Sequence, residues 1–376
     1  MEAHVEESGL KPKKVVKTLK VRVKDKHAPL LRRMAFETNQ VWNQVNEWTR
    51  DEAREPIPGF GWVKTGISST AFDVNKRLNG WTKTHDVEIN MFVAQEASRV
   101  HHESRKRTGG SKLRWRVSGG RNRSLGWVPI RKQGCSFERG QVKFAGRFFK
   151  IWDSYGLSKY DFGAASFSED ARGRWYFNVS VEVDVLPTKG TGIVGIDPGV
   201  HDAMTCSDGR KLGRAMFYRN LEEKIAKAQR AGKKDLVRAL HAKAKNRCHD
   251  AFHKFTTSLA DDYAAIAMGD VSSEWMIKTG KAKSALDSGW GILRRMLEYK
   301  ADARRGFYLE VSERGSTQTC SSCNKVGGNS PKGRAGLGIR RWTCDLCEAV
   351  HDRDVNAARN VAALGHERLA GGIPFL

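Results

Sequence analysis

The chain has 376 residues, enough for two or three folded domains. Its 66 Lys and Arg exceed its 42 Asp and Glu, which gives a net charge of +24 and predicts polyanionic partners. No apolar run approaches the roughly 20 residues of a membrane span, and residues 1–14 do not form a secretory signal, so we expect a cytoplasmic protein that binds no membrane.

The first predicted elements are one strand and two helices. Residues 13–25 alternate apolar and basic side chains with a period of two, which indicates a half-buried strand. Residues 30–48 carry an apolar stripe at steps of three and four, and residues 87–97 repeat it, so both stretches are predicted to be amphipathic helices. A basic run and a glycine-rich segment at 109–120 follow.

Strand patterns return after the helices, at 125–131, 141–152 and 174–185. Together with residues 13–25 these strands could form a small antiparallel barrel, into which the helices are inserted. Residues 187–190, Pro-Thr-Lys-Gly, then read as a linker.

Cations concentrate between Arg99 and Lys150, where 15 Lys or Arg face two acids, for a local net charge of +13. Six Trp and Phe side chains are interleaved with them, a mixture that suits phosphate pairing combined with base stacking. The alternative is a solvated basic face with its aromatic side chains in the core. As candidate nucleic-acid ligands we take five members of this run: Arg105, Lys106, Arg107, Arg121 and Arg123.

The second half begins with a buried strand that ends at Asp197, which a Pro-Gly turn follows. The carboxyl end of a strand is where sheet proteins place chemistry, although an acid before Pro-Gly can also serve only the turn. Helical sequence at 214–260 and 284–304 alternates with strands at 263–269 and 307–313. A last helix covers 355–365, and we expect it to end at Gly365.

Two C-x2-C pairs near the end predict a zinc ribbon at 319–348. Zn2+ takes four thiolates in a tetrahedron, and each close pair of cysteines can present two sulfurs to one ion. The alternatives, a pair of disulfides or a tail with coincidental cysteines, fit a chain without a secretory signal poorly. We expect one structural Zn2+, with these ligands: Cys320, Cys323, Cys344 and Cys347.

Three motifs resemble the TnpB family of transposon-encoded RNA-guided nucleases and the smallest type V CRISPR effectors. They are G-I-D-P-G at 195–199, T-Q-T-C-S-x-C at 317–323 and C-x2-C-x3-H-D-R-D-x-N-A-A-R-N at 344–360. The resemblance covers roughly residues 190–376, and the N-terminal half agrees only in architecture. It implies a prokaryotic, nucleoid-associated protein whose partners are a guide RNA and a target DNA.

The resemblance also implies a fold, an α+β and α/β multidomain architecture. An RNase H-like (RuvC) nuclease domain would comprise 188–318 and 349–376, with the zinc ribbon at 319–348 inserted into it. An antiparallel β-barrel of the wedge type would comprise 1–27 and 122–187. A helical recognition lobe, residues 28–121, would be inserted into that barrel.

In this family, acids from three separated segments bind two Mg2+ ions and hydrolyse DNA. Asp197 matches the first acid and Asp354 matches the third. At the second position most members have a segment that resembles I-E-D-L at the end of the fourth strand, and here Gly269 stands where its Glu is expected. Glu313 ends the next strand, and in an RNase H-like sheet the first, fourth and fifth strands are parallel neighbours, so we expect Glu313 to replace the missing acid. Weaker substitutes are Asp270, Glu274 and Glu310. We expect Asp352 to be a helix-start or outer-shell carboxylate rather than a metal ligand, and His201 and His351 to be structural or outer-shell residues.

The predicted function is RNA-guided cleavage of DNA beside a short flanking motif, by an Mg2+-dependent endonuclease with Asp197, Glu313 and Asp354 as catalytic ligands. One alternative keeps the guided binding without cleavage, which would make the protein a transcriptional blocker. Another is an RNase H-like resolvase that needs no guide, but this interpretation gives no reason for the helical lobe.

Overall fold

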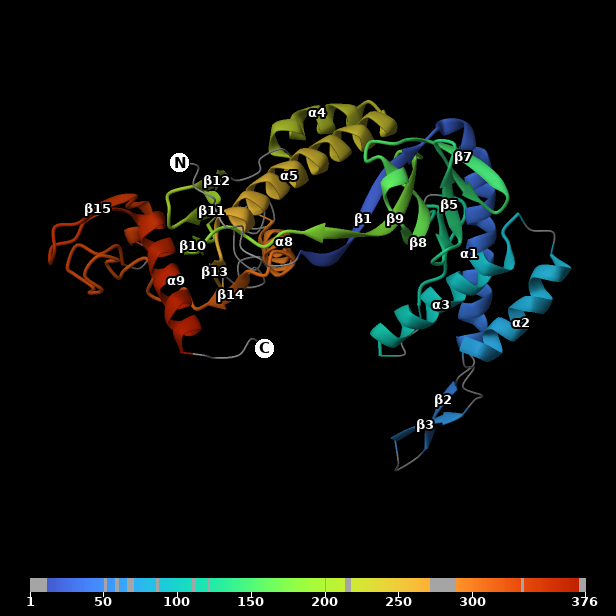
Figure 1. Ribbon diagram of the computed structural model, residues 1–376, viewed down its shortest axis with the longest axis horizontal. Coiled ribbons are helices and arrows are strands. Elements are labelled where there is room, and N and C mark those ends of the chain that lie inside the picture. The colour runs from blue at the N-terminus through green and yellow to red at the C-terminus, as the bar shows by residue number, and fades with distance from the viewer. Residues whose placement is uncertain are drawn as a thin grey trace, which may run out of the picture. The chain divides into compact units, whose positions relative to one another are not determined.

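A computed structural model describes residues 12–50, 53–57, 61–65, 71–85, 88–109, 113–120, 122–199, 201–213, 218–270, 289–332 and 335–371. The chain forms two compact units, one spanning residues 16–183 and the other residues 184–371 with the short segment 12–15 (Figure 1). Among the described residues, no helix is both long and apolar enough to cross a bilayer.

The unit at 16–183 contains a strongly curved seven-stranded sheet in the order β4-β8-β9-β1-β7-β6-β5. Its edge strand β5 contacts β8 near the other edge, so the sheet is nearly closed into a barrel. The strand pairs with a defined register are antiparallel. The strands are β1 Lys13–Val23, β4 Trp127–Ile130, β5 Cys135–Glu138, β6 Gln141–Phe144, β7 Arg147–Trp152, β8 Phe162–Glu169 and β9 Trp175–Val185.

The predicted strands are confirmed here, with one correction. The stretch 141–152 is two strands, because Ala145 and Gly146 both have positive φ and turn the chain back on itself. Alternating residues of these strands point inward, where Phe149, Phe167 and Phe177 form the fully buried centre of the core.

Three helices pack beside this barrel: α1 Ala28–Arg50, α2 Ala71–Thr84 and α3 Met91–Arg107. The apolar stripe predicted for the first of them is buried, with Met34, Val41 and Val45 inaccessible to solvent. Helix α1 contacts α2, α3 and β4. A small hairpin, β2 Ala53–Ile57 with β3 Gly61–Thr65, follows α1 in the chain.

The second unit is built on a five-stranded sheet in the order β12-β11-β10-β13-β14. The strands are β10 Ile193–Asp197, β11 Asp202–Cys206, β12 Lys211–Gly213, β13 Ala265–Gly269 and β14 Phe307–Val311. Strands β10, β13 and β14 run parallel to one another, whereas β11 and β12 are antiparallel to their neighbours. The carboxyl ends of the three parallel strands therefore lie at one edge of the sheet.

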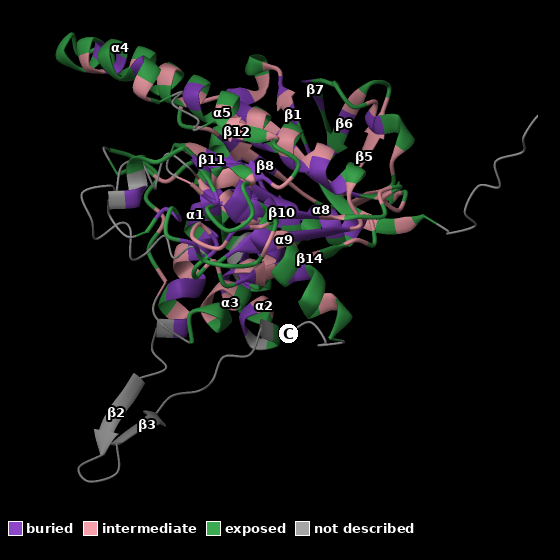
Figure 2. Ribbon diagram, turned by 90° about the vertical axis from the view of Figure 1, so that its left-hand side faces the viewer, coloured by how far each residue is buried: buried purple, intermediate pink, exposed green. Residues whose placement is uncertain are grey.

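Helices cover both faces of this sheet, so its central strands are buried (Figure 2). One face packs against α5 Lys234–Asp262 and α8 Trp290–Ala303, with Ile196, Ile266 and Met268 in the core between them. The other face packs against α9 Arg353–Ala370. Helix α4 Arg219–Arg230 lies along α5, and only one stripe of α4 is buried (Figure 2). The remaining elements are the single turns η1 Asp25–His27, η2 Leu157–Lys159 and η3 Ala335–Gly338, and the strands β15 Arg341–Thr343 and β16 Val350–Asp352.

The expectation that Gly365 ends the last helix is wrong, because α9 continues to Ala370. Gly365 lies inside the helix, where a Cβ atom would stand 2.5 Å from the Cβ of Ala267 on β13. Gly195 on β10 has the same role from the other side, since its Cβ would lie 2.0 Å from the carbonyl oxygen of Ala358 on α9. Both glycines serve the close approach of α9 to the sheet rather than a helix stop.

Candidate metal centres

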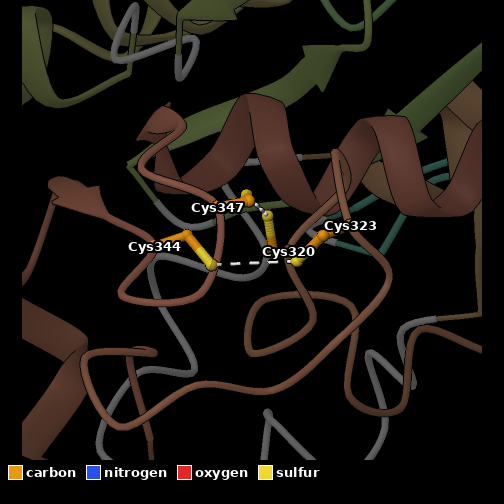
Figure 3. Close-up of side chains that lie close together, drawn as sticks. All are labelled: Cys320, Cys323, Cys344 and Cys347. Carbon is orange, nitrogen blue, oxygen red and sulfur yellow. Dashed lines mark hydrogen bonds between the residues drawn. The ribbon is translucent and has the colours of Figure 1, made fainter.

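Four cysteines come together in the segment between β14 and α9 (Figure 3). Their Sγ atoms all lie within 4.8 Å of one another, with 3.6 Å between Cys320 and Cys347 and 3.8 Å between Cys323 and Cys344. Four thiolates at about 2.3 Å from a tetrahedral Zn2+ would stand about 3.8 Å apart, so the cluster fits this ion. Within the described part of the chain, no other group of three or more ligand-type side chains is this tight.

Each cysteine pair is shaped by the same local turn. The N–H groups of Asn324 and Glu348 donate to the carbonyls of Cys320 and Cys344 at 2.8 and 2.9 Å, and both residues have positive φ. Such a turn aims two sulfurs and several backbone N–H groups at one point. Burial raises the pKa of Cys320, but the N–H groups of the turn and a neighbouring histidine outweigh it and lower the value to about 6.

The neighbouring histidine is His351, which is buried and lies on β16. Its Nε2 atom lies 3.1 Å from the Sγ of Cys320, and its ring packs against Trp342 with centroids 4.9 Å apart. An imidazole N–H that donates to a ligating sulfur holds that sulfur in place and tunes its basicity. The structure therefore places His351 directly behind the cysteine cluster.

A second set of polar groups gathers at the start of α9, directly after His351 in the chain. Asp352 is the N-cap residue, as expected, and its side chain accepts from the N–H groups of Asp354 and Val355 at 3.0 and 3.1 Å. Asp352 also pairs with Lys211 at 2.9 Å, and Asp354 pairs with Arg340 at 2.8 Å. Asp354 is thus held in the first turn of the helix, where the helix dipole favours a carboxylate.

Asp197 lies at the carboxyl end of β10, next in the sheet to the end of β13. Burial raises the pKa of Asp197 well above its usual value, and the negative charges of Glu313 and Asp354 raise it further. The Asp197 carboxyl therefore lies within electrostatic range of Glu313 and of Asp354, two residues from widely separated segments. Their carboxylates do not form a group as tight as the cysteine cluster.

Gly269 and Glu313 occupy neighbouring places at this edge of the sheet. A Cβ atom on Gly269 would lie 3.1 Å from the Oε2 of Glu313 and 3.2 Å from the Cδ of Pro198. The carboxylate of Glu313 thus fills the space beside the fourth strand that a side chain at 269 would enter. Burial, followed by the charge of Asp270, raises the pKa of Glu313 to about 7.

Of the weaker substitutes, Asp270 accepts a hydrogen bond from the backbone N–H of Glu313 at 3.2 Å, so it holds the segment that carries Glu313. Glu310 pairs with Arg294 of α8 at 3.0 Å, on the sheet face opposite α9. Glu274 lies outside the described residues. His201 is exposed and lies 3.3 Å from Asp202.

Two asparagines of the last motif were not singled out in the sequence. Asn356 and Asn360 lie on the buried side of α9, and each donates to the carbonyl oxygens of Ser316 and Thr319. Asn356 also accepts from the N–H of Ser321 at 2.8 Å. Their spacing of four residues on one helix face was the available signal.

The candidate nucleic-acid ligands occupy different environments. Lys106 and Arg107 are exposed in the last turn of α3, whereas Arg105 is partly buried. Arg123 donates to the buried carboxylate of Glu169 at 2.7 Å. Arg121 lies outside the described residues. Binding of nucleic acid by these side chains stays a prediction.

Two family models match this chain, each over part of its length. The family OrfB_IS605, "Probable transposase", matches residues 176–279, and the domain "Cas12f1-like, TNB domain" matches residues 290–361. The second match includes the four cysteines, Glu313 and Asp354. The resemblance to TnpB and small Cas12 proteins that the motifs indicated is confirmed by these matches.

Curated relatives carry related descriptions. A putative RNA-guided DNA endonuclease of Streptomyces pristinaespiralis is 37% identical over 214 residues, which are 53% of this chain and 52% of that protein. The putative RNA-guided DNA endonuclease InsQ of Escherichia coli K12 is 29% identical over 230 residues, 53% of this chain and 56% of that protein. The chain thus spans about half the length of the curated relatives it matches.

A solved structure shares the fold. The protein chain of a Cas12f1–sgRNA–target DNA complex superposes with a TM-score of 0.59 at 13% identity, over 93% of this chain and 99% of that one. At this identity the likeness concerns the fold alone.

Proposed function

We propose that this protein is an RNA-guided DNA endonuclease with a nuclease site made by Asp197, Glu313 and Asp354. The observation that supports the proposal is the buried Asp197 carboxyl at the end of β10, whose pKa is raised first by burial and then by the charges of Glu313, in the segment after β14, and Asp354, in the first turn of α9. Acids gathered against their mutual repulsion are typical of catalytic and metal sites. The descriptions of the two curated relatives supply the reaction class.

The sheet supports an RNase H-like (RuvC) assignment. In such a sheet the first, fourth and fifth strands are parallel neighbours, and here the first, fourth and fifth strands of the unit are β10, β13 and β14. Asp197 at the end of β10 and Glu313 just after β14 therefore follow the two strands that flank β13, with Gly269 at the end of β13 between them. We infer that Glu313 takes over the position of the acid that Gly269 lacks.

Mg2+ is the cofactor that fits this proposal. Carboxylate oxygens are its preferred protein ligands, and a bound cation would relieve the repulsion among the three acids. When bound, Mg2+ would polarise the scissile phosphate and lower the pKa of the attacking water. The cysteine cluster would hold a separate, structural Zn2+, since four thiolates leave no open position for substrate.

Guide RNA and target DNA are the proposed partners. The net charge of +24 favours polyanions, and the solved structure that shares the fold is a complex with both nucleic acids. Base pairing with the guide would supply most of the sequence specificity, and the protein would read only a short flanking motif.

The test uses the full chain purified with its RNA. Sequencing the bound RNA identifies the guide scaffold, and a plasmid library with randomised flanks then reports cleavage. Asp197→Asn, Glu313→Gln and Asp354→Asn should each reduce cleavage by more than about 100-fold, because ligand loss exceeds the 10–100-fold cost of disturbing an outer shell. Guided DNA binding should remain.

The matched control is Glu310→Gln, since Glu310 lies on the opposite face of β14 and pairs with Arg294. This variant should cut at the wild-type rate. If Glu313→Gln cuts normally, Glu313 leaves the mechanism. If the wild type binds its guided target and never cuts it, the protein is a guided blocker rather than a nuclease.

A further inference from the structure

An extended segment, residues 113–118, is held along α1 by a row of side chains. The Asn43 side chain makes two hydrogen bonds to the backbone of Arg116: it donates to the carbonyl at 2.9 Å and accepts from the N–H at 2.8 Å. Asn46 donates to the carbonyl of Leu113 at 3.1 Å, and Trp42 to that of Arg114 at 3.3 Å. Residues 113–118 form no helix or strand, so these side chains replace the hydrogen bonds of regular structure.

The end of the segment is held as well. Asn39 donates to the hydroxyl of Ser118 at 3.0 Å, and Val117 exchanges hydrogen bonds with Ser124 across the following loop. Residues 39, 42, 43 and 46 lie on one face of α1, at steps of three and four. The backbone of the segment is thus fixed by a rigid helix along its whole length.

The side chains of the segment divide between two directions. Arg116 points inward, where it donates to Asn39 and to the carbonyl of Leu125 and lies near the rings of Trp42 and Trp127. Arg114 and Trp115 are exposed, and Trp115 keeps 45% of its surface accessible. Within the ranges that the structure describes, no ring stacks on Trp115 and no cation lies over it.

A single exposed aromatic side chain is ordinary on a protein surface, so exposure alone does not mark Trp115 as a site; the way its backbone is held does. Here the backbone on both sides is immobilised, so the ring is presented without the entropy cost of ordering a loop. Indole rings stack on nucleobases whatever the base, and an adjacent Arg can pair with the phosphate. The local charge of +13 between Arg99 and Lys150 favours a polyanion over an apolar protein surface.

We propose that Trp115 and Arg114 form a stacking site for one unpaired nucleobase and its phosphate, with α1 as the scaffold. The inference rests on the proposed function in requiring a nucleic-acid ligand, but it does not require cleavage. The base can belong to RNA or to DNA, since both present the same ring face.

The experiment measures the affinity of the RNA-free, full-length protein for labelled oligonucleotides by fluorescence anisotropy. Single-stranded RNA and single-stranded DNA of mixed sequence are compared with an abasic tetrahydrofuran strand of equal length. Trp115→Leu should weaken binding to the base-containing strands by about 5- to 150-fold, and Trp115→Phe by much less. On the abasic strand, both variants should equal the wild type.

Trp152→Leu is the matched control. Trp152 is exposed to 43%, much like Trp115, but Lys24 and Arg22 already cover its ring, with the Lys24 Nζ 3.9 Å from the centroid. Its loss should affect base-containing and abasic strands equally. The larger Trp115 effect on RNA or on DNA identifies which strand supplies the base.

Equal affinity of Trp115→Leu and wild type for base-containing strands would overturn the proposal. So would a Trp115→Leu effect that is as large on the abasic strand. Circular dichroism melting of each variant shows whether the fold is retained. If the protein does not cleave a guided target but Trp115→Leu still weakens binding only to base-containing strands, the endonuclease proposal fails and the stacking-site proposal stands.

Discussion

Single buried polar side chains hold the proposed nuclease site to the cysteine cluster. Asn356 is 1% exposed and satisfies three backbone groups on either side of Cys320, the carbonyls of Ser316 and Thr319 and the N–H of Ser321. It stands two residues after Asp354 on the same helix. The Asn356 amide therefore fixes α9, which carries Asp354, to the segment that links Glu313 to the first cysteine pair.

Asn356→Ala should destabilise the protein by about 1–3 kcal/mol, because it leaves buried donors and acceptors without partners. Thermal melting checks this value. Asn220→Ala is the control, since Asn220 is exposed on α4. An equal shift in both variants would contradict the bridging role of Asn356.

Arg105, Lys106 and Arg107 at the end of α3 make the second prediction at this scale. Neutralising all three to Gln should reduce the slope of log affinity for RNA against log salt by roughly 0.7–0.9 for each phosphate that the variant no longer neutralises. Affinity titrations at several salt concentrations measure the slope. An unchanged slope would mean that the run is only a solvated face.

Arg123 should behave differently from that run. Its partner Glu169 is buried, with 1% of its side chain exposed, and also accepts from the N–H of Gly126. Arg123→Gln would leave the Glu169 carboxylate with a weaker partner, so this variant, unlike those of the basic run, should lower the melting temperature of the protein.

At the scale of elements, the carboxyl ends of the parallel strands β10, β13 and β14 lie side by side and limit the positions from which a carboxylate can reach the proposed site. Gly269→Glu in the wild type should lower cleavage and stability, because the new side chain would collide with Glu313 and Pro198. In the Glu313→Ala background the same substitution should restore part of the cleavage, because the carboxylate returns at the neighbouring strand end.

Single-turnover cleavage of a guided target by the two single variants and the double variant checks this exchange. A double variant no more active than Glu313→Ala would show that the two positions do not serve the same place.

Much of this arrangement could be predicted from the sequence. Period-two and helical stripes located the strands and helices that carry their own apolar face, and the motif around Asp354 placed the start of α9. The missed elements include the strands β5 and β8, the helix α2, the hairpin β2-β3 and the strands β11 and β12. Short strands in a curved sheet gain their stability from pairing with neighbours, and single-chain patterns do not reveal that pairing.

The site could be predicted only in part, for a similar reason. Four cysteines at fixed spacing are a local signal, and they meet as expected. Other features of the site depend on contacts between segments that are distant in the chain. They are the space beside Gly269, the hydrogen bond from the Glu313 N–H to Asp270 and the close packing at Gly365. Gly365 looked like a helix stop because a stop and a close contact both select glycine.

At the scale of the whole molecule, we expect zinc binding to affect the proposed nuclease site. We expect one Zn2+ per chain by elemental analysis, and Cys344→Ser should unfold the ribbon locally, since zinc binding supplies on the order of 10 kcal/mol in small domains. His351 links the cluster to the start of α9, so chelation should also reduce cleavage.

His351 offers a graded test of that link. His351→Leu removes the imidazole that lies 3.1 Å from the Sγ of Cys320, and chelators should then release zinc about 10- to 100-fold faster, whereas His351→Gln should retain part of the protection. Colorimetric zinc release measures the rates. Active protein that contains no zinc would contradict the coupling altogether.

The position of α9 has a consequence for newly made chains. Asp197 emerges from the ribosome long before residues 353–370, which cover the face of β10 and bring Asp354 to it. Domains fold as their residues become available during synthesis. A nascent or prematurely terminated chain that lacks α9 therefore lacks Asp354, one of the three proposed acids, and we expect it not to cleave DNA.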